Sequence, residues 1–180
     1  MSHPPTLMTS RLRLRPFRSE DAPEVQRLAG DRRVADGTLH VPHPYPDGEA
    51  ERWIATLEPA FDAKVLAQFA IVDLESDELR GSIGLQLNFD HDTAELGYWI
   101  GPDYWGQGLA TEAGRAVVAW GFEELGCNRI SAHHFSENIA SGRVLLKIGM
   151  QHEGHVRQAI KKDGQYLDIE LYAILRSDRR

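Results

Sequence analysis

One stretch constrains the fold of this chain more than any other: in residues 94–113 a strand passes through two glycines into a helix. Tyr98–Ile100 favours a strand, and Gly101-Pro102 ends it. From Leu109 onward the apolar residues recur at helical spacing. A helix start presents unpaired backbone N–H groups and the positive end of the helix dipole, and glycines there let an anion approach the main chain. The stretch therefore predicts an anion-binding turn at the end of a strand.

Two common phosphate-binding loops do not fit this turn. The dinucleotide fingerprint needs a third glycine where this chain has Thr111, and the P-loop needs a lysine that does not follow Gly108. The glycines could also serve turn geometry alone. Residues 105–110 (Trp-Gly-Gln-Gly-Leu-Ala) instead resemble the Gln/Arg-x-x-Gly-x-Gly/Ala pyrophosphate loop of the GNAT N-acetyltransferases, with Trp105 in place of the usual Gln or Arg.

A second stretch, residues 138–150, is similar to the GNAT passage Asn-x-x-Ser-x-x-x-x-x-Lys-x-Gly-Phe, with Met150 in the Phe position. Many superfamily members carry a tyrosine general acid where this chain has Leu145. The RimJ/RimL type, the ribosomal-protein N-terminal acetyltransferases and their relatives, carries a serine one helical turn after the asparagine, which corresponds to Ser141. The chain therefore resembles the RimJ/RimL type, and the resemblance runs from about Leu12 to Leu175.

The resemblance implies an α+β fold, with residues 1–180 as a single GNAT-type domain. We expect a mixed, mostly antiparallel sheet of about seven strands flanked by four helices. Its two parallel strands, residues 95–100 and 128–135, should splay apart to admit a cofactor.

Periodicity and turn signals place the remaining elements. We expect a helix near residues 19–29 capped by Ser19, and a second helix over residues 47–63 capped by Asp47. A further helix is expected to start at Ser136 or Asn138 and to stop at Gly149. The other strands fall at residues 11–15, 66–74, 79–89, 152–161 and 166–175. The arginines of the first strand could form an anion site, but a solvated strand face is the favoured interpretation.

The cofactor that the resemblance implies is acetyl-CoA, as a co-substrate, and no metal is required. Its pyrophosphate is expected on the backbone amides of the glycine turn, namely Gly106, Gln107, Gly108, Leu109, Ala110 and Thr111. Its pantetheine arm is expected to pair with the backbone of Trp99 and Ile100 like an added strand. Asn138 would hydrogen-bond the same arm.

Acyl transfer to an amine needs a neutral nitrogen, and because an α-amino group titrates at about pH 8, a general base helps. Glu95 matches the position of a catalytic glutamate in part of the superfamily and would draw the proton through water. The alternative for Glu95 is a solvated carboxylate at the start of a strand. Ser141 would hydrogen-bond the departing thiolate and deliver a proton, the alternative being a serine on a helix surface.

The predicted function is N-acetyl transfer to a primary amine, with a ribosomal or other protein N-terminus as the favoured acceptor. The alternatives are a small amine (an amino acid, polyamine or antibiotic) and an acyl-CoA-binding sensor without turnover. The proline-rich segment 38–48 is placed at the acceptor site by resemblance, and a rigid surface loop is an equal alternative. The resemblance is also compatible with a homodimer.

Composition excludes several other classes. A formal charge of −7 argues against a nucleic-acid binder that relies on a basic surface. No apolar run suits a membrane span, and Met1–Pro5 lacks a signal-peptide core. The single cysteine, Cys127, rules out an intrachain disulfide and suits a reducing cytoplasm, so a cytoplasmic protein is expected.

Three further side-chain groups carry weak signals. Cys127 is expected to pack in the core, with a catalytic thiol as the alternative. His91 lies between two aspartates, and His133-His134 are adjacent, but neither group has further ligands at suitable spacing. We therefore expect no metal site.

Overall fold

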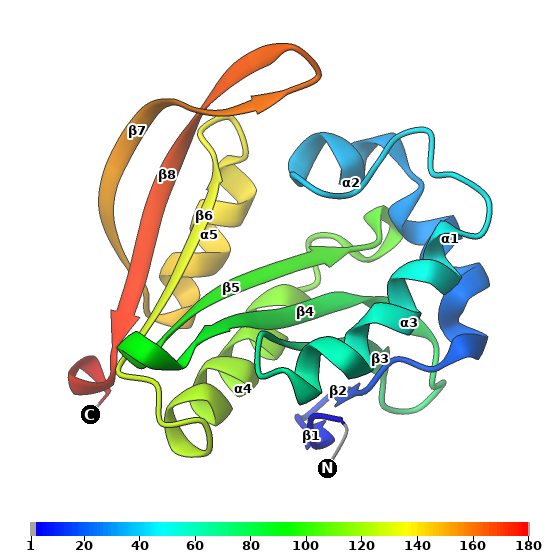
Figure 1. The fold of residues 1–180 in the computed structure, drawn as a ribbon, viewed down its shortest axis with the longest axis horizontal. Helices are drawn as coiled ribbons and strands as arrows, with labels where there is room; N and C mark the ends of the chain where they lie inside the picture. Colours follow the sequence, from blue (N-terminus) through cyan, green and yellow to red (C-terminus); the bar gives the residue numbers. More distant parts are fainter. Residues whose placement is uncertain (1–2, 180) are drawn as a thin grey trace.

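The computed structural model describes residues 3–179. One eight-stranded sheet, in the order β1-β2-β3-β4-β5-β6-β8-β7, organises them (Figure 1). The strands are β1 (Leu7–Met8), β2 (Leu12–Arg15), β3 (Leu66–Asp73), β4 (Leu79–Asn88), β5 (Thr93–Ile100), β6 (Arg129–Phe135), β7 (Gln151–Lys162) and β8 (Gln165–Leu175). The helices are α1 (Ala22–Ala29), α2 (Arg32–Gly37), α3 (Glu49–Asp62), α4 (Leu109–Glu123) and α5 (Ile139–Ile148). Short 3-10 turns are η1 (Ser19–Asp21), η2 (Phe89–His91), η3 (Pro102–Tyr104) and η4 (Arg176–Asp178).

The predicted α+β class and the mixed, mostly antiparallel sheet are confirmed. The sheet has one strand more than the expected seven, and there is one helix more than the expected four. The extra strand, β1, has two residues, which is too short for a periodic pattern. The extra helix, α2, has six residues and is N-capped by Asp31, whose side chain accepts a hydrogen bond from Arg33 N.

Two of the helix caps predicted from sequence, Ser19 and Asp47, are wrong. Ser19 lies in η1, and α1 begins only after Asp21. Asp21 accepts hydrogen bonds from the Arg15 guanidinium (2.7 and 2.8 Å) and from Arg18 N (2.8 Å). Helix α3 begins after Gly48 in the left-handed region, with no side-chain cap, and Asp47 instead accepts a hydrogen bond from Gln26 (3.0 Å).

The expected solvated arginine face on the first strand is also wrong for Arg15. Its side chain is only 6% exposed and forms an ion pair with the side chain of Asp21, which is 10% exposed. Arg13 pairs with Asp77, and Arg11 pairs with Glu112. These arginines therefore join parts of the fold and do not form an anion site.

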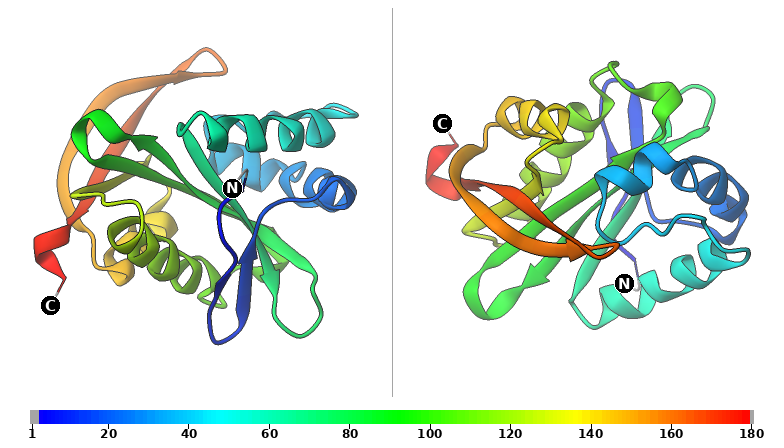
Figure 2. Two further views of the ribbon diagram at one scale, coloured as in Figure 1. Left: turned by 60° about the horizontal axis from the view of Figure 1, so that its bottom comes forward. Right: turned by 90° about the horizontal axis from the view of Figure 1, so that it is seen from above.

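Helices cover both faces of the sheet (Figure 2). Helices α4 and α5 pack on one face, where Trp120 meets Phe69 edge to face at 5.3 Å between ring centroids. Helices α1 and α3 pack on the other face, with Val25 and Leu28 against Val72. Both faces of the sheet are therefore covered by helices.

The cleft opens where β5 and β6 separate. These two strands pair in parallel at only three positions: Thr93 with Arg129, Ala94 with Ile130, and Glu95 with Ser131. Beyond Glu95, β5 continues to pair with β4, while β6 continues to pair with β8. The predicted splayed parallel pair is confirmed, and Figure 1 shows the two strands diverging.

None of the helices within residues 3–179 is long and apolar enough to cross a membrane. The expectation about Met1–Pro5 falls partly outside the described residues, because Met1 and Ser2 precede them.

The N-terminal segment is tied to the first turn of α4 through Glu112. Its carboxylate accepts hydrogen bonds from Thr9 Oγ1 (2.7 Å), Ser10 Oγ (2.9 Å), and the backbone and side chain of Arg11 (2.9 and 2.7 Å). Burial by itself would raise the pKa of Glu112, but these hydrogen bonds outweigh it and lower the pKa to about 2.

This lowered pKa predicts a pH-dependent contribution to stability. A carboxyl group whose folded-state pKa lies below its ordinary value of 4.5 stabilises the fold above that pH, and the contribution disappears as pH falls towards 2. We expect the difference in free energy of unfolding between the wild type and Glu112→Gln to be constant above about pH 5 and to shrink below it. Urea denaturation at a series of pH values measures this difference. A difference that stays unchanged across the acid range would contradict the assignment.

Candidate active site

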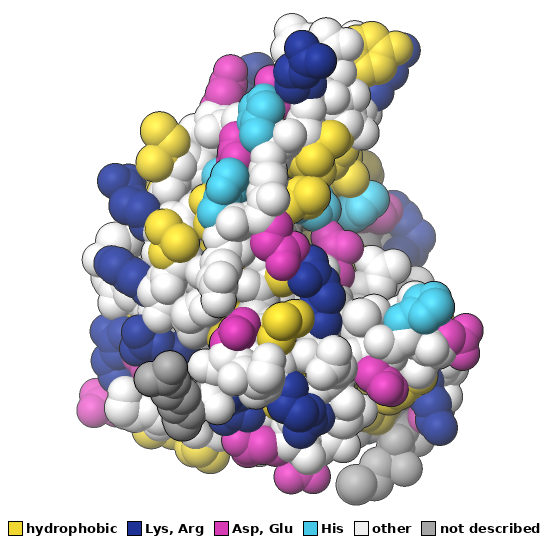
Figure 3. Space-filling model, turned by 90° about the vertical axis from the view of Figure 1, so that its left-hand side faces the viewer, with side chains coloured by type: hydrophobic (Ala, Val, Ile, Leu, Met, Phe, Trp, Pro, Cys, Tyr) yellow, Lys and Arg dark blue, Asp and Glu magenta, His cyan; other side chains and the backbone are white. Residues whose placement is uncertain are grey.

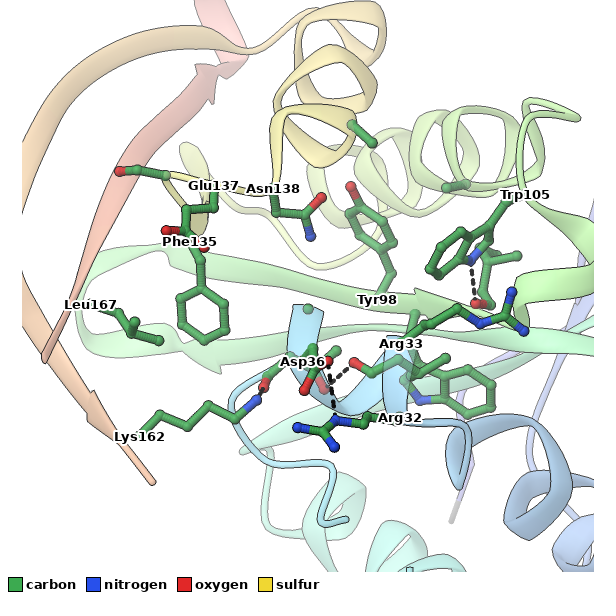
Figure 4. Close-up of a pocket in the computed structure, with 18 of the residues that line it drawn as sticks. Arg32, Arg33, Asp36, Tyr98, Trp105, Phe135, Glu137, Asn138, Lys162 and Leu167 are labelled. Atoms are coloured by element: carbon green, nitrogen blue, oxygen red, sulfur yellow. Dashed lines mark hydrogen bonds and ion pairs between the residues drawn. The ribbon is translucent and has the colours of Figure 1, made fainter. Parts of the chain in front are cut away.

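Two adjoining cavities lie at the splayed strands. The larger cavity has a volume of about 940 Å³ and the smaller cavity about 370 Å³. Six residues line both: Gly37, Thr38, Tyr98, Trp99, Phe135 and Asn138. The close-up in Figure 4 shows several of these side chains converging between β5, α2 and the start of α5. Two molecules bound in the two cavities would meet at this shared wall.

The glycine turn forms one end of the larger cavity. Gly106 and Gly108 each have φ of +77°, a conformation that side-chain-bearing residues rarely adopt, and Gly108 is the N-cap of α4. The first helical hydrogen bond runs from Glu112 N to Gly108 O, so the N–H groups of Leu109, Ala110 and Thr111 have no intrahelical acceptor. The turn therefore has the geometry of an anion site.

Not every residue predicted in the turn faces the cavity. Gly106, Gly108, Leu109 and Ala110 line the larger cavity, whereas Gln107 and Thr111 are absent from its wall. The Gln107 carbonyl accepts a hydrogen bond from Arg11 (3.0 Å) on the outer side of the turn.

Trp105, the residue that departs from the family pattern, binds the end of β5. Its indole N–H donates to Ile100 O at 2.7 Å, and its ring is half exposed to the larger cavity (Figure 4). The Arg33 guanidinium lies 5.8 Å from the ring centroid. Trp105 thus holds the loop against the last strand carbonyl.

The backbone of β5 corrects part of the pantetheine prediction. Gly101 N donates to Arg80 O, and hydrogen-bonded pairs alternate along an antiparallel ladder. Trp99, two residues earlier, therefore directs its N–H and C=O toward Ser82 of β4, its partner in register. The backbone N–H and C=O of Ile100 face the opening toward β6, and the carbonyl already accepts the hydrogen bond from Trp105. Of the Trp99 and Ile100 backbone groups that were expected to bind the arm, the Ile100 N–H is therefore the one available. Trp99 lines the cavity wall instead.

The two cavities differ in charge. Arg32, Arg33 and Lys162 line the larger cavity, together with the carboxylates of Asp36, Glu137, Asp163 and Asp168. No lysine or arginine is among the described residues that line the smaller one, which holds the carboxylates of Glu49 and Glu95. The larger cavity therefore carries charges of both signs, and its anion-binding groups are the free amides of the glycine turn, with the Arg33 guanidinium nearby beside Trp105. The smaller cavity suits a cationic or neutral ligand.

Lys162, in the wall of the larger cavity, also connects two elements that border it. Its ammonium group, at the tip of the β7–β8 hairpin, donates to Thr38 O at 2.6 Å and to Ala35 O at the end of α2. These contacts join the terminal hairpin to α2 across the cleft, and Figure 2 shows the hairpin arching over toward this helix.

Asn138 and Ser141 lie together at the start of α5. Asn138 is the N-cap, and its Oδ1 accepts a hydrogen bond from Ser141 N at 3.2 Å. Ser141 Oγ lies 2.7 Å from the hydroxyl of Tyr98 on β5. Leu145, at the position where many superfamily members have tyrosine, is fully buried in the core, so it leaves that position without an acid.

Tyr98 carried no functional signal in the sequence beyond its preference for a strand. Burial raises its pKa to about 12, and the hydrogen bond with Ser141 opposes this shift only in part. The hydroxyl therefore stays protonated at neutral pH. The strand pattern of the sequence places the Tyr98 side chain on the opposite face of β5 from Glu95 and Gly97. Its contact with Ser141 of α5 could not be seen in the sequence.

Glu95 lines the smaller cavity and pairs with a histidine. Its Oε1 lies 2.6 Å from Nδ1 of His133 on β6. The hydrogen bond from His133 lowers the pKa of Glu95, burial opposes this, and the charge of His40 adds to the lowering. Glu95 is thus an anion facing the smaller cavity. The register that pairs Glu95 with Ser131 brings His133, two residues further on, to the same face.

The proline-rich segment borders the smaller cavity, as its predicted role requires. Leu39–Pro42 and Tyr45 form one wall, opposite Gly97 of β5. A Cβ built on Gly97 meets no atom within 4 Å, so the missing side chain leaves open space in the wall.

The other groups with weak signals have structural roles. Cys127 is buried, which raises the pKa of its thiol. His134 is buried and stacks on Tyr172 at 5.4 Å between ring centroids. Within residues 3–179, no group of three or more His, Cys, Asp or Glu residues is placed to hold a metal ion.

A histidine–carboxylate cluster on the β7–β8 hairpin had no signal in the sequence. Glu170 accepts hydrogen bonds from His155 (2.6 Å), His152 (2.7 Å) and Ser136 (2.8 Å), which lower its pKa to about 2. The same contact with Glu170 raises the pKa of His155. Figure 3 shows histidine and acidic side chains next to one another on this face. The cluster joins the two strands of the hairpin on its outer surface.

Comparison with known proteins places this geometry in a family. Residues 11–151 match the acetyltransferase (GNAT) domain. The uncharacterized N-acetyltransferase YoaA of Bacillus subtilis is 38% identical over 71% of this chain and 73% of its own length. A GNAT-family acetyltransferase from Bacillus anthracis has a crystal structure with a TM-score of 0.85 and 27% identity, covering 95% of this chain and 98% of that one.

One relative has a named acceptor. The [ribosomal protein uS5]-alanine N-acetyltransferase of Escherichia coli is 34% identical over 46% of this chain and 43% of its own length. The match with the GNAT domain covers most of the chain and includes the glycine turn, the splayed strands and the Asn138–Ser141 helix start. The chain belongs to the acetyltransferase (GNAT) family and is an acetyl-CoA-dependent N-acetyltransferase.

Proposed function

We propose that this enzyme acetylates the α-amino group of a protein N-terminus. Acetyl-CoA occupies the larger cavity, with its pyrophosphate on the turn formed by residues 106–111 and its arm beside Ile100 and Asn138. The free amide groups of that turn support this assignment, because they match the oxygens of a pyrophosphate, and the Arg33 guanidinium lies nearby beside Trp105. The amine enters the smaller cavity and meets the thioester at the shared wall.

The observation that carries the choice of acceptor is the charge of the smaller cavity. A free amino acid has a carboxylate beside its amine, and burying that carboxylate requires a cation. The cavity wall offers Glu49 and Glu95, with no lysine or arginine among its described residues. A peptide N-terminus has an amide in place of that carboxylate, so it meets no repulsion. The uS5-alanine relative, whose acceptor is a ribosomal protein, supports the same choice.

Three groups have a chemical role in this proposal: a base, an oxyanion donor and an acid. Glu95, ionised and facing the amine, receives the proton that the attacking nitrogen loses, directly or through water. A backbone N–H on the splayed part of β5, such as that of Ile100, stabilises the negative oxygen of the tetrahedral intermediate. Ser141 donates its hydroxyl proton to the sulfur as the carbon–sulfur bond breaks.

A second candidate acceptor is a polyamine. The same two carboxylates attract cations, and the aromatic side chains of Tyr45, Trp53 and Trp99 line the same cavity. Aromatic faces bind ammonium groups by cation–π attraction. This candidate differs from the first in needing no peptide backbone.

Free-thiol release from acetyl-CoA distinguishes these acceptors. The amines to compare are an alanine-initiated peptide, the same peptide with a blocked N-terminus, alanine amide, alanine and spermidine. We expect turnover with the unblocked peptide, and higher kcat/KM for alanine amide than for alanine. Turnover with spermidine but not with the peptide would favour the second candidate. The absence of turnover with every amine would contradict the proposal.

Gly97→Val tests the assignment of the smaller cavity. The valine side chain would project into space that the acceptor occupies, at a cost of about 1–3 kcal/mol, while leaving the glycine turn untouched. We expect the acceptor KM to rise by about tenfold or more with an unchanged Kd for CoA. Steady-state kinetics with titration calorimetry measures both. A raised Kd for CoA with a normal acceptor KM would place the acceptor elsewhere.

A further inference from the structure

The contact between Tyr98 and Ser141 joins two elements that are remote in sequence. The two hydroxyl oxygens lie 2.7 Å apart, and the residues are separated by 43 positions. Tyr98 lines both cavities, and Figure 4 shows its ring rising from β5 toward the start of α5. Its hydroxyl is therefore next to the point where the acyl donor and the amine meet.

The direction of this hydrogen bond decides what Ser141 can do. Ser141 has one hydroxyl proton, so if it donates to Tyr98 it has none for the sulfur. A phenol is a stronger acid than an aliphatic alcohol and hence the stronger donor, which favours donation by Tyr98. Burial raises the pKa of Tyr98 to about 12, so at neutral pH the phenol keeps the proton that it can donate to Ser141.

Without Tyr98, a competing acceptor is available to Ser141. Serine hydroxyls within helices donate to the carbonyl of the preceding turn. Among residues 3–179, Tyr98 is the sole side chain within hydrogen-bond distance of Ser141 Oγ. The tyrosine hydroxyl thus fills one site on the serine oxygen and restricts where the serine proton points.

We propose that Tyr98 is a positioning residue for acyl transfer: it donates to Ser141 Oγ and directs the Ser141 proton toward the thioester sulfur. This inference rests on the proposed function and supplies, from β5, the tyrosine hydroxyl that Leu145 cannot supply from α5. When the carbon–sulfur bond breaks, its electron pair stays on sulfur and the Ser141 proton moves there. Ser141 is reprotonated from solvent, the amine proton leaves through Glu95, and Tyr98 keeps its proton.

A double-mutant cycle tests the proposal. Tyr98→Phe removes the hydroxyl and keeps the ring, and we expect kcat to fall about tenfold with the KM for acetyl-CoA changed by less than about twofold. In the Ser141→Ala background the same substitution should change kcat by less than about twofold, because the group that it positions is absent. Tyr172→Phe, at another buried tyrosine with a stacking role, is the matched control and should keep the wild-type kcat.

A binding measurement keeps the test independent of the acceptor. Calorimetry gives the preference of each variant for CoA over desulfo-CoA, which lacks the sulfur that Ser141 contacts. We expect Tyr98→Phe and Ser141→Ala to reduce this preference to a similar level, and the double variant to reduce it no further.

Two results would overturn the proposal: an unchanged preference and kcat in Tyr98→Phe, or an equal loss in the Ser141→Ala background. Failure of the proposed function would give a different result. In that case no amine would support turnover by the wild type, whether or not the wild type prefers CoA over desulfo-CoA.

Discussion

Glu95→Gln should lower kcat by about a hundredfold with the Kd for CoA unchanged. The substitution keeps the size of the side chain and removes the proton acceptor, and general-base catalysis contributes about 10²–10⁴-fold to rates. Glu95 lines only the smaller cavity, so the glycine turn and the basic residues of the larger cavity are unaffected. Thiol release under saturating acetyl-CoA measures kcat, and calorimetry measures the Kd.

Glu49→Gln is the matched control, because Glu49 is the other carboxylate in the wall of the smaller cavity. It pairs with Arg52 on its own helix rather than with a cavity histidine, and we expect its kcat to stay within about threefold of the wild type. A wild-type kcat in Glu95→Gln would remove the base assignment, and an equal loss in both variants would reduce it to a general charge effect.

The pH dependence of the wild type should reflect the acceptor rather than Glu95. The hydrogen bond from His133 lowers the pKa of Glu95, so this carboxylate is ionised throughout the neutral range. An α-amino group loses its proton only at about pH 8. We therefore expect kcat/KM for a peptide acceptor to rise toward that pH.

Asp21→Ala should destabilise the fold by about 3–5 kcal/mol, the range for removing one partner of a buried ion pair. The side chains of Arg15 and Asp21 are 6% and 10% exposed, and the carboxylate binds both terminal guanidinium nitrogens. The hydrogen bond with Asp21 raises the pKa of Arg15 in the wild type. Without Asp21 the guanidinium still stays charged, because arginine is not deprotonated in proteins. Urea denaturation monitored by tryptophan fluorescence gives the free energy of unfolding.

Glu24→Ala, in the exposed pair with Arg27 on α1, provides the comparison. Exposed ion pairs contribute about 0–1 kcal/mol, so this variant should unfold close to the wild type. A loss in Asp21→Ala no greater than in Glu24→Ala would show that Arg15 finds another partner. Asp77, whose carboxylate lies 4.0 Å from Arg15 Nε, is the nearest acidic group for that role.

Local features were the ones that the sequence predicted well. The glycine turn needs two residues with positive φ, and the start of α5 needs an asparagine cap followed by a glycine stop at Gly149. Each requirement falls on one or two residues whose backbone preference can be read directly. The helix caps at Ser19 and Asp47 failed because a tertiary partner, Arg15 or Gln26, takes the nearby carboxylate.

The positions of side chains across the cleft could not be read in the same way. Glu95 and Ser141 were named from family resemblance, but their partners His133 and Tyr98 were not. Each contact depends on a strand register or on the angle at which β5 leaves β6, and neither is encoded in a short segment. The register between β5 and β4 likewise directs the Trp99 backbone groups, which were expected to pair with the cofactor, toward Ser82 of β4.

By itself, the sequence determined the glycine turn and the start of α5, because backbone conformation at those places depends on local residue type, and its resemblance to the GNAT family indicated the class of fold. The tertiary structure decided which side chains face each other: Tyr98 with Ser141, Glu95 with His133, and Lys162 with the end of α2. It also separated a cavity lined by both basic and acidic side chains from one whose described walls carry carboxylates without lysine or arginine. Hydrogen bonds and charge effects act over a few ångströms, so they are settled only when distant segments are brought together.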